Sequence, residues 1–270
     1  MIRAEYVTID GAIGFAEVSG EGTPLVCIHT AGQSGVQWRD VLRTLGGEGY
    51  QVIVPDLPGH GRSDNPTRGP VTELSVYALW LAELLAALSV TEPLVVGCSI
   101  GGKIALELAA SPMVLPRAVV AMAADAYNSQ LSVRGLQRAL EDAASPSRAD
   151  RTYFGTLSSV GSAMPAERAR AVAAMHRRED PVVATSDLIG WSTHDLRDQL
   201  AHVRCPVHLV AGEDDFWIDP QAVAWAAAQI PNGSFELLRG AGHYPMEELA
   251  NFPRRLTAWF DSLLSNRMEQ

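Results

Sequence analysis

The chain has 270 residues, of which 47% are hydrophobic, and its 21 basic and 31 acidic side chains give a formal net charge of −10. This length and composition predict one globular unit with a large core and room for an inserted subdomain. The acidity and the absence of a lysine or arginine cluster argue against binding to nucleic acid or to an anionic membrane surface.

The cysteines and the N-terminus indicate the compartment. Cys27, Cys98 and Cys205 lie far apart in apolar or strand-like contexts, which is typical of buried thiols in a reducing compartment rather than of disulfides or a metal site. No stretch has the pattern of a signal peptide or of a membrane span. We therefore expect a cytoplasmic protein.

Short β-rich stretches alternate with helical patterns along most of the chain. The stretch EYVTIDGAIGFAEV predicts a hairpin that turns at Asp10-Gly11. Further strands are expected at PLVCIHT, QVIVPD, PLVVG, RAVVAM, PVHLVAG and SFELL, with helices between and after them. The longest helix, TELSVYALWLAELLAALSV, places Leu74, Tyr77 and Leu81 on one apolar face, as core residues. This alternation predicts an α/β fold, with a mostly parallel sheet covered by helices on both faces.

One segment breaks the alternation. From about Asn128 to about Trp191 no strand is expected, but the helical stretches VRGLQRALEDAA and PAERARAVAAMHRRE are separated by turn residues. The mixed charge of the second stretch is typical of a solvated helix face. We predict a core domain of residues 1–127 and 192–270, with a helical insertion at 128–191.

The stretch LVVGCSIGGKIALELA places a serine between two glycines where a strand ends and a helix begins. Gly97, Ser99 and Gly101 form the pattern G-x-S-x-G, in which the glycines avoid clashes across a tight turn. The helix directs free N–H groups toward the serine hydroxyl. A serine that only caps the helix is the alternative. In this context the pattern predicts that Ser99 is a nucleophile.

A serine nucleophile requires a base, because its hydroxyl is not ionised at neutral pH. His243 lies in a glycine-rich loop, RGAGHYPMEE, after the last strand and before the last helix. His208 falls inside a predicted strand and His60 in a glycine-rich turn, where packing or bracing is the expected role. We therefore expect His243 to be the base.

The base in turn requires an acid that holds its second nitrogen. Asp214, Asp215 and Asp219 follow the strand PVHLVAG, on the carboxyl edge where parallel sheets gather reactive residues. Helix capping accounts for Asp219. Asp214 and Asp215 remain as candidates, and with either one the chain order is Ser, Asp, His.

Four stretches together resemble the α/β-hydrolase fold family: HTAGQSGVQW, PDLPGHGRSDNP, GCSIGG, and GEDD with GAGHYPMEE. The family shares the order Ser, Asp, His. The resemblance implies that the acid is Asp215, the third residue after Gly212, that the histidine is His243, and that a later family glutamate is Glu248. It also implies an eight-stranded sheet with a helical cap inserted after the sixth strand.

The same resemblance implies an oxyanion hole, formed by the backbone N–H groups of Ile100 and Ala31. The family's usual His-Gly pair is here His29-Thr30. A hydroxyl-bearing side chain therefore replaces a hydrogen beside the hole. Thr30 either packs in the loop, donates an additional hydrogen bond, or narrows the substrate pocket.

The resemblance implies a serine hydrolase that cleaves a small carboxylic ester or lactone through an acyl-enzyme, with no metal and no cofactor. Dehalogenases and epoxide hydrolases of the family carry a carboxylate in place of Ser99. A hydrolase of carbon–carbon bonds in ring-cleavage products and a protein that only binds a small ligand are the alternatives. The expected partner is a small molecule, and the sequence does not fix the oligomeric state.

Aromatic residues flank the motif loops and are candidates for an apolar substrate pocket. Trp191 is of particular interest, because it lies where the chain returns from the insertion. The candidate pocket residues are Thr30, Trp38, Tyr127, Trp191, Phe216, Trp217 and Tyr244.

Overall fold

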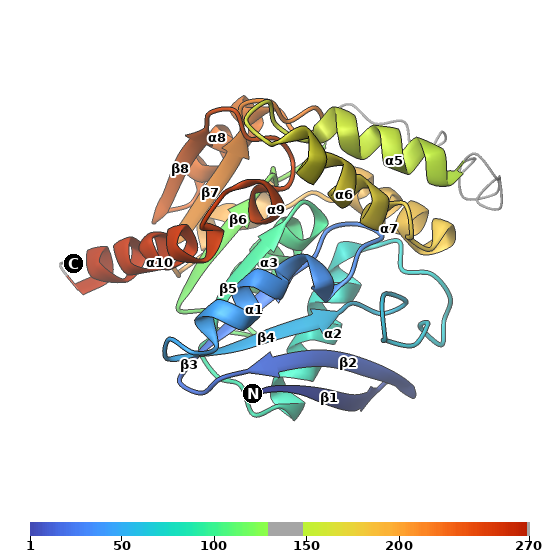
Figure 1. Ribbon diagram of the computed structural model, residues 1–270. Helices are drawn as coiled ribbons and strands as arrows, with labels where there is room; N and C mark the ends of the chain where they lie inside the picture. The colour runs from blue at the N-terminus through green and yellow to red at the C-terminus, as the bar shows by residue number, and fades with distance from the viewer. Residues whose placement is uncertain (129–147, 269–270) are drawn as a thin grey trace.

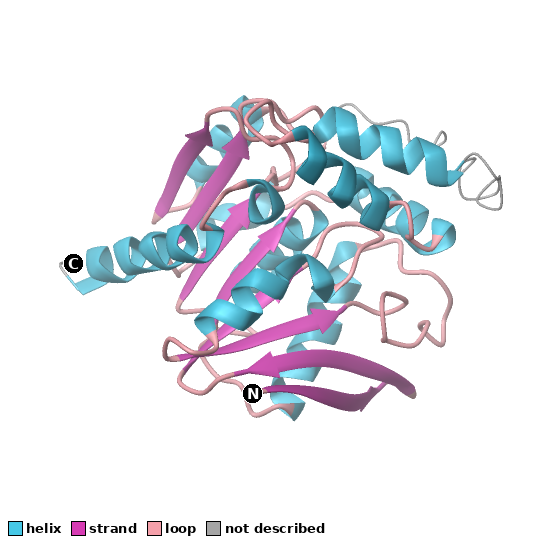
Figure 2. Cartoon of the chain, in the orientation of Figure 1, coloured by secondary structure: helices cyan, strands magenta, loops and turns pink. Residues whose placement is uncertain are grey.

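The computed structural model describes residues 1–128 and 148–268. Within these residues the strands form one eight-stranded sheet, in the order β1-β2-β4-β3-β5-β6-β7-β8 (Figure 2). β2 pairs antiparallel with both β1 and β4, whereas the pairs from β4 to β8 are all parallel. The predicted mostly parallel α/β sheet of eight strands is thereby confirmed.

Each strand expected from the sequence is present, and the bounds differ from the predicted stretches by a few residues. The strands are β1 Ile2–Ile9, β2 Ala12–Ser19, β3 Thr23–Ile28, β4 Tyr50–Asp56, β5 Leu94–Cys98, β6 Ala118–Met122, β7 Val207–Gly212 and β8 Gly233–Leu238. The hairpin turns at Asp10-Gly11 as predicted, and both residues have positive φ angles, 48° and 80°.

Helices cover both faces of the sheet. Figure 1 shows α1 and α10 in front of it and α2 and α3 behind it. The helices are η1 Gly35–Trp38, α1 Arg39–Leu45, α2 Leu74–Ala87, α3 Ile100–Ala110, α5 Arg148–Ser159, α6 Ala166–His176, α7 Pro181–Thr193, η2 Arg197–His202, α8 Pro220–Gln229, α9 Pro245–Glu248 and α10 Phe252–Met268. The central strands are buried on both faces, which explains their unbroken apolar sequences.

The segment between β6 and β7 contains α5, α6 and α7, which lie over the carboxyl ends of the strands (Figure 1). The predicted stretch PAERARAVAAMHRRE contains α6, while VRGLQRALEDAA lies outside the described residues. We call α5 to α7 the cap. The division into a core and a cap of residues 128–191 stays a prediction, and α7 itself continues to Thr193.

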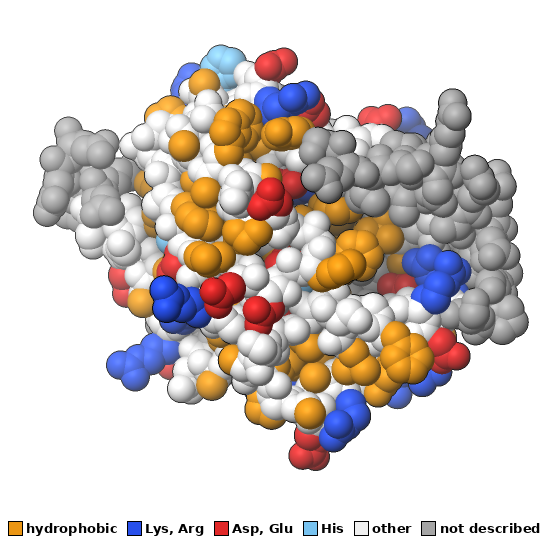
Figure 3. Space-filling view, turned by 90° about the horizontal axis from the view of Figure 1, so that it is seen from above, with side chains coloured by type: hydrophobic (Ala, Val, Ile, Leu, Met, Phe, Trp, Pro, Cys, Tyr) orange, Lys and Arg blue, Asp and Glu red, His pale blue; other side chains and the backbone are white. Residues whose placement is uncertain are grey.

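The surface of the cap side carries side chains of every type. In Figure 3 basic and acidic side chains are interspersed with hydrophobic ones, in agreement with the absence of a basic cluster from the sequence. Among the described helices none is both long enough and apolar enough to cross a bilayer.

Candidate active site

Ser99 lies at the turn between β5 and α3. Its φ angle is 57° and its ψ angle is −120°, a strained conformation for a residue with a side chain. A Cβ at Gly97 would overlap the backbone of Gly101, and one at Gly101 would overlap the backbone of Ile28. The two glycines therefore allow β5, α3 and β3 to approach closely enough to force this turn.

His243 and Asp215 come together from the loops that follow β8 and β7. Nδ1 of His243 lies 2.8 Å from Oδ2 and 3.0 Å from Oδ1 of Asp215, whose side chain is fully buried. Oδ1 also accepts hydrogen bonds from the amides of Trp217 and Ile218 at 2.8 and 3.2 Å. Since a carboxylate only accepts, the pair places the histidine proton on Nδ1 and leaves Nε2 as the basic nitrogen.

The neighbouring carboxylate has a different partner. Oδ2 of Asp214 accepts a hydrogen bond from the amide of Ser162, in the cap, at 2.7 Å. The side chain of Ser162, and then this amide, lower the pKa of Asp214. Of the two candidates that the strand end offered, Asp215 is therefore the one that contacts His243.

Glu248 holds the loop that carries His243. Its Oε2 accepts from the amides of Gly242 and Gly161 at 2.7 and 2.8 Å, and its Oε1 accepts from the amide of Tyr244 at 2.8 Å. Two of these amides flank His243 and the third belongs to the cap. Burial raises the pKa of Glu248 in spite of these bonds.

The loop after β3 is held in place at Thr30. The Thr30 carbonyl accepts hydrogen bonds from Nδ1 of His29 at 2.8 Å and from the amide of Gln33 at 3.2 Å. The amide and hydroxyl of Thr30 both donate to Oε1 of Gln37, at 3.0 and 3.1 Å. The Thr30 hydroxyl is thus turned into the loop.

The partners of His29 define its protonation. Its Nε2 accepts a hydrogen bond from the amide of Leu57 at 3.0 Å, so this nitrogen carries no proton, and Nδ1 must carry one to donate to the Thr30 carbonyl. Burial, and then the charge of His60, lower the pKa of His29 to about 3, which keeps this neutral form. Because a trans peptide is planar, the bond to the Thr30 carbonyl also fixes the direction of the Ala31 N–H.

The amides of Ala31 and Ile100 have free N–H groups at this point. Ile100 is the first residue of α3, so its N–H has no partner within the helix. In the described part of the chain the Ala31 N–H donates to no protein acceptor.

A cavity of about 210 Å³ opens at Ser99, beneath the cap. This volume is smaller than that of a typical drug-sized pocket. Arg148, Arg151 and Glu179 add charged groups from the cap, and Oε1 of Glu179 lies 3.3 Å from Nε of Arg148. The candidate site residues that line it are Thr30, Ala31, Ser99, Trp191, Trp217, His243 and Tyr244.

Three candidate pocket residues lie elsewhere. Trp38 is fully buried in the core, where its ring lies 6.0 Å from that of Phe252. Tyr127 packs on Trp225 at 5.7 Å, next to the guanidinium of Arg197. Phe216 is 74% exposed, whereas its neighbour Trp217 donates a hydrogen bond from Nε1 to Oγ of Ser159 at 2.7 Å.

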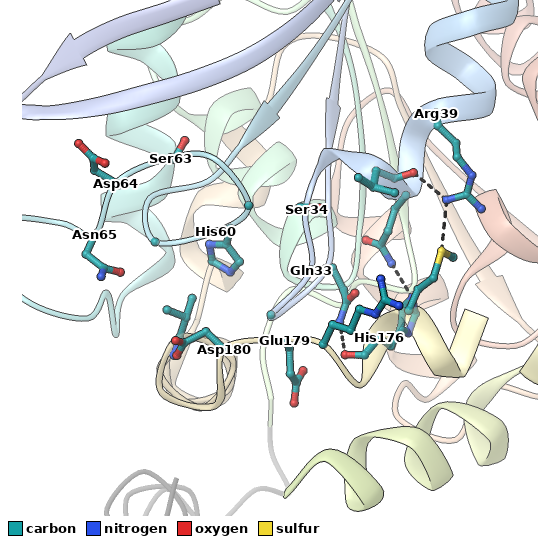
Figure 4. Close-up of a pocket in the computed structure, with 18 of the residues that line it drawn as sticks. Gln33, Ser34, Arg39, His60, Ser63, Asp64, Asn65, His176, Glu179 and Asp180 are labelled. Atoms are coloured by element: carbon teal, nitrogen blue, oxygen red, sulfur yellow. Dashed lines mark hydrogen bonds between the residues drawn. The ribbon is translucent and has the colours of Figure 1, made fainter. Parts of the chain in front are cut away.

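A second, outer pocket of about 630 Å³ lies on the other side of the loop that follows β3. Glu179 lines both this pocket and the one at Ser99. Figure 4 shows that two core loops and the cap contribute its walls, with labelled residues Gln33, Ser34, Arg39, His60, Ser63, Asp64, Asn65, His176, Glu179 and Asp180.

The sequence reasoning missed the polar residues that join the cap to the core. Asp187 is fully buried and accepts hydrogen bonds from Gly32, His60 and Tyr77. Its signal in the sequence was a single carboxylate within the apolar stretch PVVATSDLIGW, since an isolated buried charge must have partners. Gln37 offered no such signal.

Several proteins with known names are similar to this chain over most of its length. Magnesium-chelatase 30 kDa subunit of Rhodobacter capsulatus is 32% identical over 242 residues, which cover 86% of this chain and 84% of that protein. Pimeloyl-[acyl-carrier protein] methyl ester esterase of Nitrosomonas europaea is 27% identical over 261 residues, covering 92% and 98%.

Solved structures share the fold. A thermophilic esterase from Thermogutta terrifontis superposes with a TM-score of 0.84 at 22% identity, covering 98% of both chains. The enol-lactonase from Burkholderia xenovorans LB400 superposes with a TM-score of 0.78 at 19% identity, covering 97% of this chain and 98% of that one. Residues 25–258 match the Alpha/beta hydrolase family, and the chain belongs to that family.

Proposed function

We propose that this protein is a serine hydrolase that cleaves a small carboxylic ester or lactone. The observation that carries the proposal is the bond of Asp215 to Nδ1 of His243, in a pocket that Ser99 also lines. This pairing leaves Nε2 of His243 to act on the serine proton. A buried carboxylate is the group required to stabilise the imidazolium that forms.

In the proposed reaction, Nε2 of His243 takes the proton from Ser99 Oγ as that oxygen attacks the substrate carbonyl carbon. The tetrahedral intermediate then collapses, the carbon–oxygen bond to the leaving group breaks, and His243 returns the proton to the leaving alkoxide. Water attacks the acyl-enzyme in the same way, with His243 as base. The acid leaves and Ser99 regains its proton.

The negative charge that develops on the substrate oxygen would be held by the N–H groups of Ile100 and Ala31. Both are free to donate, and the Ala31 N–H is held in direction through the Thr30 carbonyl. Amides fixed before the reaction stabilise this charge without reorganisation, which is the largest contribution in many acyl-transfer enzymes.

The cavity and the relatives support a small acyl substrate. A volume of about 210 Å³ favours a short acyl group. The names of similar proteins include an ester hydrolase of Nitrosomonas europaea and an enol-lactonase of Burkholderia xenovorans LB400. Ester and lactone hydrolysis use the same triad, so either bond is compatible with this site.

Hydrolysis of a carbon–carbon bond is a second candidate. That reaction needs polar groups in the cap or core that hold a dienoate, and Arg148 and Arg151 place two cations in the wall of the cavity. A dienone substrate of this class therefore belongs beside the ester series in the assay.

The test is hydrolysis of p-nitrophenyl esters of increasing acyl length, followed through many turnovers. Wild type is expected to turn over the shorter esters, and Ser99→Ala to lose the activity by several orders of magnitude. Ser111→Ala is the matched control, because Ser111 caps the opposite end of the same helix. Retained activity in Ser99→Ala would refute the proposal.

Absence of turnover in the wild type on every ester would also overturn it. Turnover of the dienone would then support carbon–carbon hydrolysis. Stoichiometric binding without turnover would instead support a protein that only binds a ligand.

A further inference from the structure

We propose that Asp187 of the cap is a positioning residue for the oxyanion hole of the core. The inference rests on the proposed function, since it concerns the loop that carries the Ala31 N–H. Oδ2 of Asp187 accepts a hydrogen bond from the amide of Gly32, the next residue along that loop, at 2.8 Å. The contact joins residues 155 positions apart in the sequence.

Within the described residues Asp187 accepts three hydrogen bonds, all from the core. Besides the Gly32 amide, Oδ2 accepts from Nε2 of His60 at 2.8 Å, and Oδ1 accepts from the hydroxyl of Tyr77 at 2.6 Å. Its side chain and that of His60 are 0% and 1% exposed. A carboxylate buried at this depth is stable only because each of its oxygens has a donor.

The partners of His60 make it the positive member of the pair. Its Nδ1 faces the carbonyls of Leu57 and Pro58 at 3.3 and 3.1 Å, and its Nε2 faces the Asp187 carboxylate. Because these groups only accept, both ring nitrogens carry protons. His60 also lines the outer pocket, where Figure 4 shows it on the loop that continues to Ser63.

The bond to Gly32 controls the Ala31 N–H through two peptide planes. The plane before the Ala31 Cα is held at the Thr30 carbonyl by His29, and the plane after it is held at the Gly32 amide by Asp187. Each peptide is rigid, so these two bonds fix both backbone angles of Ala31. The Ala31 N–H lies in the first plane. Without Asp187 that plane is anchored only on its Thr30 side, so the Ala31 N–H can shift away from the substrate oxygen when the loop moves.

Gly32 itself allows the cap to reach this loop. Its φ angle is +66°, and a Cβ there would overlap Ala184 and Glu179 of the cap. A second cap residue reaches the same loop, because Nε2 of His176 contacts Gln37, which holds Thr30. The cap therefore holds the loop at two points, and the oxyanion hole of the core is completed by residues outside it.

The test separates the hydrogen-bond acceptor from the charge. Asp187→Ala removes both, whereas Asp187→Asn keeps an oxygen for the Gly32 amide and an NH₂ group for the Tyr77 oxygen. We expect both variants to lower the Tm, since both leave His60 without its counter-charge. For Asp187→Ala we expect kcat on a p-nitrophenyl ester to fall about 10- to 100-fold with little change in KM. For Asp187→Asn we expect kcat to fall by less than about 5-fold.

A transition-state mimic gives the second readout. The affinity for an alkyl trifluoromethyl ketone, which forms a tetrahedral adduct with a serine, should fall in parallel with kcat/KM in Asp187→Ala. Glu107→Ala is the matched stability control: it removes another carboxylate that pairs with a buried histidine, His194 at 3.1 Å, far along α3 from the loop. It should lower the Tm and leave kcat within about twofold.

Two results would overturn the inference. One is an unchanged kcat in Asp187→Ala; the other is a kcat that follows the Tm across all three variants, which is the behaviour of a merely structural residue. If Asp187→Ala does not fold, the double variant Asp187→Ala/His60→Gln removes the unpaired charge and carries the same comparison. Ester hydrolysis that persists in Ser99→Ala would instead refute the proposed function, which is a separate outcome.

Discussion

Asp214 and Asp215 are neighbours in the chain, but their carboxylates bind different residues. Asp215 contacts Nδ1 of His243 at 2.8 Å, whereas Asp214 accepts from the amide of Ser162 in the cap at 2.7 Å. From their position after β7 alone, both were candidates for the acid that binds the histidine. The turn after β7 directs one carboxylate into the site and the other to the surface.

Asp215→Asn is therefore expected to lower kcat on a p-nitrophenyl ester by about 10⁴-fold, because an asparagine has no charge to stabilise the imidazolium and its NH₂ group favours the wrong histidine tautomer. Asp214→Asn is the matched control and should change kcat by less than about fivefold, since Asp214 binds Ser162 of the cap and does not contact His243. Equal losses in the two variants would show that the contact with His243 is not what matters.

Glu248→Gln should lower both the Tm and kcat. Three backbone amides now donate to the two carboxylate oxygens of Glu248, whereas a glutamine has only one acceptor oxygen. Amides beside His243 therefore lose their acceptor. Each buried amide left without a partner costs about 1–3 kcal/mol of stability. Thermal unfolding and ester hydrolysis check this together, with the exposed Glu83→Gln as control. A Glu248→Gln variant with wild-type kcat would mean that the loop holds its shape without these bonds.

The buried pair of His60 and Asp187 predicts a pH window of stability. Burial would lower the pKa of His60, but Asp187 raises it; burial would raise the pKa of Asp187, but His60, Tyr77 and Gly32 lower it. His29 and Tyr77 also face the His60 ring, and among the residues that the structure describes its charged partner is Asp187.

The signs of the two shifts define the window. The raised pKa of His60 contributes stability that is full below about pH 6.5 and is lost as the pH rises through the folded-state pKa. The lowered pKa of Asp187 contributes stability that is full above about pH 4 and is lost as the pH falls through its folded-state pKa. The Tm difference between wild type and Asp187→Asn should thus be greatest between these values. A difference that grows above pH 8 would contradict the assignment.

Trp191 should set the acyl-length preference. It lines the cavity at Ser99 and is 4% exposed, whereas Phe216 is 74% exposed and lies outside the cavity. Trp191→Leu should enlarge the cavity and shift the maximum of kcat/KM toward longer p-nitrophenyl esters. Phe216→Leu removes a similar aromatic side chain nearby and should leave the profile unchanged. The reverse pattern would place the acyl group near Phe216 instead.

Much of the fold was readable from local patterns. The eight strands and the helix α2 appear where apolar stretches and the 3.6-residue period placed them. The short helix α9 was not expected, because four residues are too few to show a period. Tyr77 follows the α2 pattern as a buried residue, yet its hydroxyl binds Asp187, which no period of apolar residues reveals.

The sequence by itself determined the elements, their order and the motif positions of Ser99, Asp215 and His243, because turn glycines and apolar periods act over a few residues. Only the tertiary structure decided which polar side chains meet. Asp187 reaches Gly32 across 155 positions, and Trp38 turns into the core instead of the pocket. Such contacts depend on how the cap and the sheet pack together, and burial then requires that every charged group brought inside finds a partner.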